Sequence, residues 1–335
     1  MKRNNRQYDR HIITNERTKE QTTILVERGT EVLIPVKSSE LSDNQKKFLE
    51  KRSQLQKIVE KEFGGFIHMS YIKNEILYND LNITDSNIAR IIYLATFLCF
   101  SYNEFAVIEI DRTKYTLLVH DSEYKTESKQ PLNKKDIQKI LKLKDGVFKI
   151  FFKEMVENNI LLEHDKKIYI NNSYFKKGSA TADIVNKDKN YTRIFIDTTR
   201  ILYEGCAKPT EHRKLSKAFQ IIPLAHKELN RLCYNPSAKN FEEISLMDIR
   251  GIASQLKVST DRSNLRKLEK ELLSIKITRG DYEYPFIAKV VESTSEHEFS
   301  YYTINPNIAW RGHRNDILSL LLEQSVFKIA KKKVE

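Results

Sequence analysis

The clearest hydrophobic periodicity of the chain lies between Leu132 and Gly178. Apolar residues recur there at steps of three and four, which place them on one face of a helix. The first set is Ile137, Ile140 and Leu141, and the second is Phe148, Phe152 and Met155. We therefore expect a short helix and a longer helix with Leu143 in the turn between them. Asp145 is the expected N-cap of the longer helix.

Two short alternating runs follow these helices, at 160–163 and 168–171. Alternation favours strands, and Asp165-Lys166-Lys167 between the runs predicts the tip of a β-hairpin. The order helix, turn, helix, hairpin is that of a winged helix-turn-helix, in which the second helix enters the major groove of DNA.

A fainter copy of the same pattern lies further along the chain. Residues 245–256 predict a helix, and residues 257–260 predict a turn. Leucines at steps of three and four then predict a second helix. Alternating runs at 286–291 and 299–304 follow it and predict a longer wing. Corresponding apolar positions are Ile137, Leu141 and Leu143 with Ile252, Leu256 and Val258, and Ile170-Asn171 with Ile304-Asn305. This agreement favours duplication of one supersecondary unit over chance similarity of short apolar patterns.

The expected fold class is α+β and helix-rich, with two tandem winged helix-turn-helix domains and an N-terminal extension. Residues 1–63 form a basic N-terminal arm, flexible to residue 22, then short strands and a helix over 42–62. The expected domains are 64–178 and 191–320, joined by a linker at 179–190, and a basic tail occupies 321–335.

The net charge of the chain indicates what kind of partner it binds. The chain has 335 residues, a formal net charge of +12 and a pI near 9.3. Such a balance favours a polyanion, nucleic acid before an anionic membrane surface. The most apolar run, 91–100, is only half the ~20 residues that a membrane span needs. Three dispersed cysteines and no apolar leader suit a cytoplasmic protein.

The run Leu132–Gly178 and the close Tyr301-Tyr-Thr-Ile-Asn-Pro-Asn-Ile-Ala-Trp-Arg-Gly312 resemble winged helix-turn-helix proteins of Gram-positive phages and plasmids. These include plasmid replication proteins of the RepL type and phage DNA-binding regulators. The resemblance covers about a third of the chain. It implies a mobile-element protein that acts on DNA in a bacterial host, associated with the nucleoid.

Candidate DNA-binding residues lie on the helix faces that the core does not require and on the first wing. They are Lys144, Lys149, Lys153, Lys166 and Lys167 in the first half, and Arg262, Ser263, Asn264, Arg266 and Lys267 in the second. Arginine matches guanine and asparagine matches adenine through paired hydrogen bonds. The second half is therefore expected to read sequence, whereas the first, together with Lys134 and Lys135, mainly contacts phosphates.

Signals for enzyme chemistry are weak, so no catalytic residue, metal ligand or nucleotide cofactor is expected. The chain lacks a phosphate-cradling Gly-x-x-x-x-Gly-Lys loop and a paired-histidine metal motif. The run Trp310-Arg-Gly-His-Arg314 is the most enzyme-like cluster, but it is better explained by a tryptophan packed under the wing and phosphate-binding cations.

The function predicted is a sequence-specific double-stranded DNA-binding transcription regulator, a repressor. A replication initiator that binds origin repeats is the alternative, followed by a strand-transfer enzyme and a protein-interaction module. Two tandem units would contact half-sites about one helical turn, ~10 bp, apart. If the chain forms a homodimer, its site would be longer and palindromic.

Overall fold

The computed structural model describes residues 8–14, 21–27, 64–70, 81, 83–99, 106–120, 130–177, 191–293, 298–310, 327 and 329–330. The chain divides into two compact units, Met1–Gln54 and Leu55–Glu335. The helix expected over 42–62 and the linker expected at 179–190 lie outside the described residues.

The N-terminal unit contains a β-hairpin. Strand β1 (Tyr8–Thr14) pairs antiparallel with β2 (Gln21–Glu27), in a register that sets Tyr8 opposite Glu27 and Thr14 opposite Gln21. Strand β1 therefore lies within the arm expected over residues 1–22, and the flexibility of that arm stays a prediction. The run Ile12-Ile13-Thr14 is β-branched, which favours an extended backbone.

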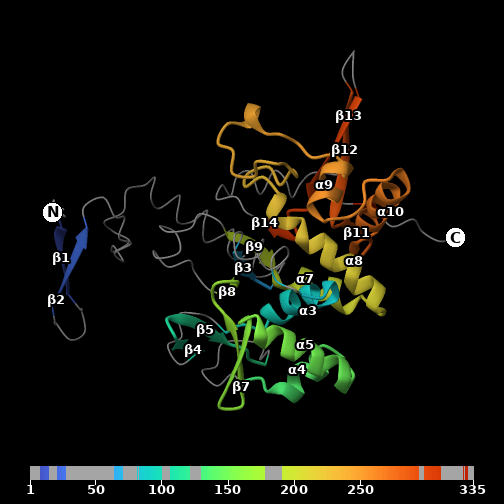
Figure 1. The fold of residues 1–335 in the computed structure, drawn as a ribbon. Coiled ribbons are helices and arrows are strands. Elements are labelled where there is room, and N and C mark those ends of the chain that lie inside the picture. The colour runs from blue at the N-terminus through green and yellow to red at the C-terminus, as the bar shows by residue number, and fades with distance from the viewer. Residues whose placement is uncertain are drawn as a thin grey trace. The chain divides into compact units, whose positions relative to one another are not determined.

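A four-stranded antiparallel sheet lies at the centre of the second unit, in the order β14-β9-β3-β8 (Figure 1). Its strands are β3 (Phe66–Ser70), β8 (Phe175–Lys176), β9 (Tyr191–Phe195) and β14 (Ala309–Trp310). The inner pair, β3 and β9, comes from different halves of the chain, with Ile67 opposite Ile194. Each half adds one outer strand, so the sheet joins the halves symmetrically.

The first half continues from β3 into three helices and a second sheet. The helices are α3 (Asp85–Ala95), α4 (Lys134–Ile140) and α5 (Asp145–Glu157). The strands, in the order β4-β5-β7-β6, are β4 (Val107–Ile110), β5 (Thr113–Leu117), β6 (Leu161–His164) and β7 (Lys167–Asn171). The predicted helix-turn-helix and hairpin thus correspond to α4, α5 and β6–β7.

The second half repeats this order with additions. Its helices are α7 (Ile196–Glu204), α8 (Pro209–Gln220), α9 (Ile249–Gln255) and α10 (Arg262–Leu273), with short 3-10 turns at Ile222–Leu224 and Phe241–Glu243. A hairpin of β10 (Lys276–Arg279) and β11 (Tyr282–Pro285) follows α10 directly and was not foreseen. The longer wing predicted from the sequence is a further hairpin, β12 (Ile287–Ser293) with β13 (Glu298–Ile304).

The C-terminal tail also contributes to the sheet structure. Strand β15 (Ile329–Ala330) pairs with β11, and Phe327 is buried. A purely basic tail over 321–335 was therefore an incomplete description, because an apolar anchor lies within it. The seven α-helices and several antiparallel sheets of the described residues make the fold α+β, as predicted.

The turn inside each helix pair has the same geometry. Lys142 and Lys257 both adopt a left-handed backbone, with φ of 52° and 53°. The residue after each donates its amide to a carbonyl five residues back, the hydrogen bond of a Schellman motif. The two bonds are Leu143 N to Gln138 O, 3.1 Å, and Val258 N to Ala253 O, 2.9 Å. The similarity of the two helix pairs thus extends to backbone hydrogen bonds, and their origin by duplication stays a prediction.

A buried asparagine closes each half in the same way. Asn171 and Asn305 each accept an amide hydrogen from the residue two positions on, and each donates its side-chain amide to a main-chain carbonyl. The contacts are Ser173 N at 2.8 Å and Asn159 O at 2.9 Å for Asn171, and Asn307 N at 2.9 Å and Pro285 O at 2.8 Å for Asn305. An Asx turn of this kind turns the chain toward the central sheet.

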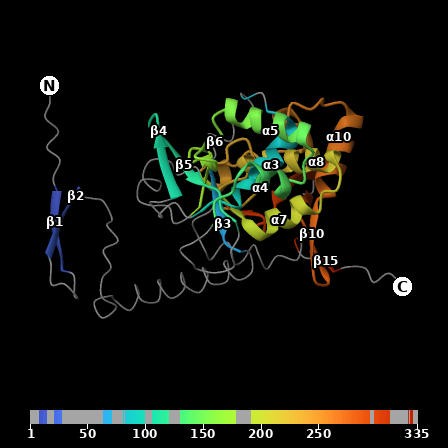
Figure 2. The same ribbon diagram turned by 90° about the horizontal axis from the view of Figure 1, so that it is seen from below.

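Helix α3 connects the halves, lying against α7 and α8 (Figure 2). The Glu154 carboxylate of α5 accepts hydrogen bonds from the backbone and hydroxyl of Thr84 and from Asn87, at 2.8–3.0 Å. Ser216 of α8 accepts from the amide of Ala89 at 3.0 Å, and Arg200 of α7 donates to Thr96 at the end of α3. Hydrogen bonds along α3 therefore fix the relative position of the halves.

A stacked pair of tyrosines lies at the contact of α3 with α7. The rings of Tyr93 and Tyr203 are 4.0 Å apart and nearly parallel. Burial raises the pKa of Tyr203 to about 12, although the positive charge of Arg90 opposes the shift. The folded protein therefore keeps this proton at pH values where the unfolded chain, with a tyrosine pKa near 10, loses it.

The free energy of unfolding should accordingly fall as the pH rises from about 10 to about 12. Below pH 10 both states hold the proton, and Tyr203 contributes no pH dependence. Tyr203→Phe removes this titration, so its stability should fall less steeply over the same range. Urea unfolding of both proteins between pH 8 and about 12 measures the difference, and parallel curves would contradict the assignment.

Candidate nucleic-acid interface

Helix α10 carries the base-reading residues expected from the sequence. Leu268 and Leu272 are buried and fix the side of the helix that faces the core. Arg262, Ser263, Arg266 and Lys267 are exposed, and Asn264 is half-buried. The structure thus places four of the five residues on the solvent side of α10 and the fifth at its border.

The acidic residues of α10 are hydrogen bonded to other elements. Glu269 accepts from the hydroxyl of Tyr302 and lies 2.9 Å from Nζ of Lys289, and Glu271 lies 3.1 Å from Nζ of Lys217. Burial raises the pKa of Glu269, but its hydrogen bonds to Tyr302 and Lys289 outweigh this and leave the pKa below its usual value.

The cations of α10 are different. In the part of the chain that the structure describes, no ion pair involves the side chains of Arg262, Arg266, Lys267 or Lys270. Within that part of the chain the outer face of α10 therefore presents cations that no ion pair neutralises. Such a face suits an anionic partner.

Helix α5 has a mixed outer face. Phe148, Phe151, Phe152 and Met155 are buried, which explains Phe151 as a core residue. Lys144, Lys149 and Lys153 are exposed, as predicted, and Lys153 lies 3.6 Å from Glu157. Lys144 rather than Asp145 occupies the N-cap position, because Asp145 already has helical geometry and accepts a hydrogen bond from Gln138.

The first wing ends in a two-residue turn. Asp165 and Lys166 have φ of 50° and 62°, the positive values of a type I′ turn, which suits the twist of paired strands. Lys166 and Lys167 are both exposed. Lys167 is the first residue of β7 rather than part of the turn, so its side chain is set by the strand.

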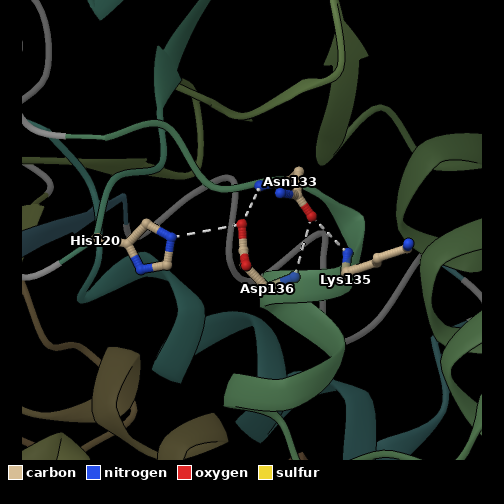
Figure 3. Close-up of polar contacts among 4 residues, drawn as sticks. All are labelled: His120, Asn133, Lys135 and Asp136. Carbon is tan, nitrogen blue, oxygen red and sulfur yellow. Dashed lines mark hydrogen bonds and ion pairs between the residues drawn. The ribbon is translucent and has the colours of Figure 1, made fainter.

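The N-terminus of α4 is capped by the side chains of Asn133 and Asp136 (Figure 3). Asn133 accepts from the amides of Lys135 and Asp136 at 2.8 and 3.2 Å, and Asp136 accepts from the amide of Asn133 at 3.0 Å. His120 Nε2 lies 3.4 Å from the Asp136 carboxylate. In this capping box the helix amides already have acceptors, so a phosphate contact here depends on the side chain of Lys135.

Lys134 does not match its expected role as a phosphate contact. Its Nζ lies 2.6 Å from the Glu163 carboxylate of β6 and 4.7 Å from the centre of the Phe152 ring. The lysine therefore ties α4 to the wing and to α5. The sequence could not show this, because Glu163 becomes a neighbour only when the hairpin folds back on the helices.

A hollow of about 660 Å³ beside α9 was missed by the sequence analysis. Its lining includes Tyr234, Arg250, Thr260 and Phe299, and the two aromatic rings are about half exposed. Thr260 lies two residues before α10, so the hollow adjoins the start of that helix. The run Tyr234-Asn-Pro, an aromatic residue in a polar loop, was the available signal.

Trp310 does not lie under a wing. It belongs to β14, opposite Arg193 of β9, and is fully buried in the central sheet. The following cations, Arg311 and Arg314, and His313 lie outside the described residues.

The two sets of candidate residues lie on helices whose inner faces share one hydrophobic core. Contacts run from α5 through α3 and α8 to α10, and one hydrophobic cluster contains buried residues of both halves. In the described residues no three His, Cys, Asp or Glu side chains gather where they could bind a metal ion. Within the same ranges, no helix has the length and apolarity needed to cross a membrane.

Comparison with known proteins gives no match: no family model, no curated protein and no solved structure is significantly similar to this chain.

Proposed function

We propose that this chain is a sequence-specific double-stranded DNA-binding protein with two winged helix-turn-helix units. The observation that carries the proposal is the outer face of α10, where Arg262, Arg266 and Lys267 are exposed while both glutamates of the helix bond elsewhere. A helix in this position of the motif enters the major groove. Arginine there can make paired hydrogen bonds to guanine.

Within this class we propose a transcription regulator of the phage or plasmid type, a repressor associated with the bacterial nucleoid. A replication initiator that binds origin repeats is the second candidate. The fixed arrangement of the two halves does not separate a repressor from an initiator, because both roles need two DNA-binding halves at a fixed separation. Genome-wide mapping of bound DNA separates them, since a repressor occupies promoters and an initiator occupies repeats at an origin.

Affinity for duplex DNA should fall steeply with salt, because lysines that neutralise phosphates release counterions. If four phosphates are contacted, the association constant should fall about 100-fold between 50 and 200 mM salt. Fluorescence anisotropy with a labelled duplex measures this dependence. An affinity independent of salt would reject the proposal and favour a protein-interaction module.

A further inference from the structure

We propose that the outer face of α5 recognises thymine methyl groups in the major groove. This inference rests on the proposed function and assigns a base preference to the half that was expected mainly to contact phosphates. The site consists of Val147, Ile150 and Lys153 on α5, with Gly146 in the first turn and Lys144 at the N-cap of the helix.

The apolar part of the row is exposed although it lies on a well-packed helix. Val147 is 43% exposed and Ile150 is 66% exposed, whereas Phe148, Phe151 and Met155 of the same helix are buried. Exposed apolar side chains three residues apart lie one above the other on a helix. They form a narrow apolar strip rather than part of the core.

Cations bound the strip at both ends. Lys153 lies three residues after Ile150 and neighbours it on the helix surface, whereas Lys144, three residues before Val147, occupies the N-cap position ahead of the first turn. Lys149 is exposed next to Ile150. This charge complements the phosphates that line a major groove on both sides of its bases, whereas an apolar protein partner would have to desolvate the lysines.

Gly146 allows the helix to approach closely. A side-chain Cβ at this position would meet no atom within 4 Å, so packing within the protein does not require glycine. Without a side chain at Gly146, the first turn of α5 has a smaller diameter. This turn is at the N-terminal end of the helix, the end of a recognition helix that contacts base edges. Thymine is the base that presents a methyl group in the major groove, and apolar side chains contact it there.

The test compares thymine with uracil, which differs from it by the methyl group. Duplexes that the full chain binds are selected from a random library amplified with thymidine triphosphate, and each thymine of the selected site is then replaced singly by uracil. We expect two or more replacements, clustered in one half-site, to weaken binding about fourfold each, the factor for removing one buried methyl group.

Variants locate the effect on α5. Ile150→Ala should bind the thymine duplex more weakly and lose its discrimination against uracil at one or more of these positions. Ile201→Ala is the matched control, because Ile201 is 39% exposed on α7, outside both helix pairs. It should discriminate as the unchanged protein does.

Four outcomes would overturn the inference. Salt-dependent DNA binding without uracil sensitivity would reject thymine recognition and leave the proposed function intact. Uracil sensitivity that survives in Ile150→Ala would assign the methyl contact to another element. A change of oligomeric state in Ile150→Ala, measured by light scattering, would make the strip a protein interface; absence of any DNA binding would reject the proposed function as well.

Discussion

Replacing Arg266 by alanine should weaken binding to the selected DNA site by about 5- to 150-fold, or about 1–3 kcal/mol. Arg266 lies on the exposed face of α10, and no ion pair holds it in the described residues. Its guanidinium can donate two hydrogen bonds to one guanine. Random DNA does not place a guanine at the position that Arg266 contacts. Binding to random duplexes should therefore change little. Titrations of both duplexes by fluorescence anisotropy measure the two losses.

Arg213→Ala is the matched control for charge. Arg213 is exposed on α8, outside both helix pairs, and its removal lowers the net charge by the same amount. We expect this variant to bind both duplexes almost as tightly as the unchanged protein. Equal losses on specific and random DNA in Arg266→Ala would contradict base reading and assign the residue to phosphate contact.

Phe151→Ala should destabilise the second unit by about 3–5 kcal/mol, the usual cost of truncating a buried phenylalanine. The Phe151 ring has no solvent exposure and lies in the cluster that both halves share. Trp310 is the single tryptophan of the chain and is buried in the central sheet, so its fluorescence reports unfolding. Urea titration followed by this signal measures the change.

The Ile201→Ala variant controls for the loss of an apolar side chain at a half-exposed site. Its unfolding midpoint should move much less, because Ile201 is already 39% exposed in the folded state. A loss below about 1 kcal/mol in Phe151→Ala would show that α5 packs loosely, contrary to the burial of its inner face.

Local periodicity predicted the helix pairs because each element carries its own signal. The steps of three and four in α5 and α10 set which residues are buried, and the exposed lysines and arginines followed from that arrangement. The repeated turn could also be predicted, since Leu-Lys followed by an apolar residue appears in both copies. These features depend on neighbours close in sequence.

The central sheet depends on neighbours far apart. Ile67 pairs with Ile194, and a strand of five residues carries too little alternation to reveal its partner. The start of α8, in contrast, carries a local signal of its own. Pro209 begins the helix, and Glu211 accepts hydrogen bonds from the amides of Ala207 and Lys208, which favours a helix start.

The candidate site shows the same division. Exposure of Arg266 and Ile150 followed from helix periodicity, whereas the ion pair of Lys134 with Glu163 required the folded hairpin. The hollow near Tyr234 and Phe299 combines a loop with a distant strand. Residues that act from one helix could be predicted, and those brought together by tertiary contacts could not.

The two winged helix-turn-helix halves of the chain are proposed to bind one DNA duplex together. Hydroxyl-radical footprinting on a selected duplex tests it most directly, because it maps each protected sugar. We expect two protected segments about one helical turn, ~10 bp, apart, since hydrogen bonds along α3 hold the halves together. A single protected segment, or none at protein concentrations that saturate binding, would contradict it.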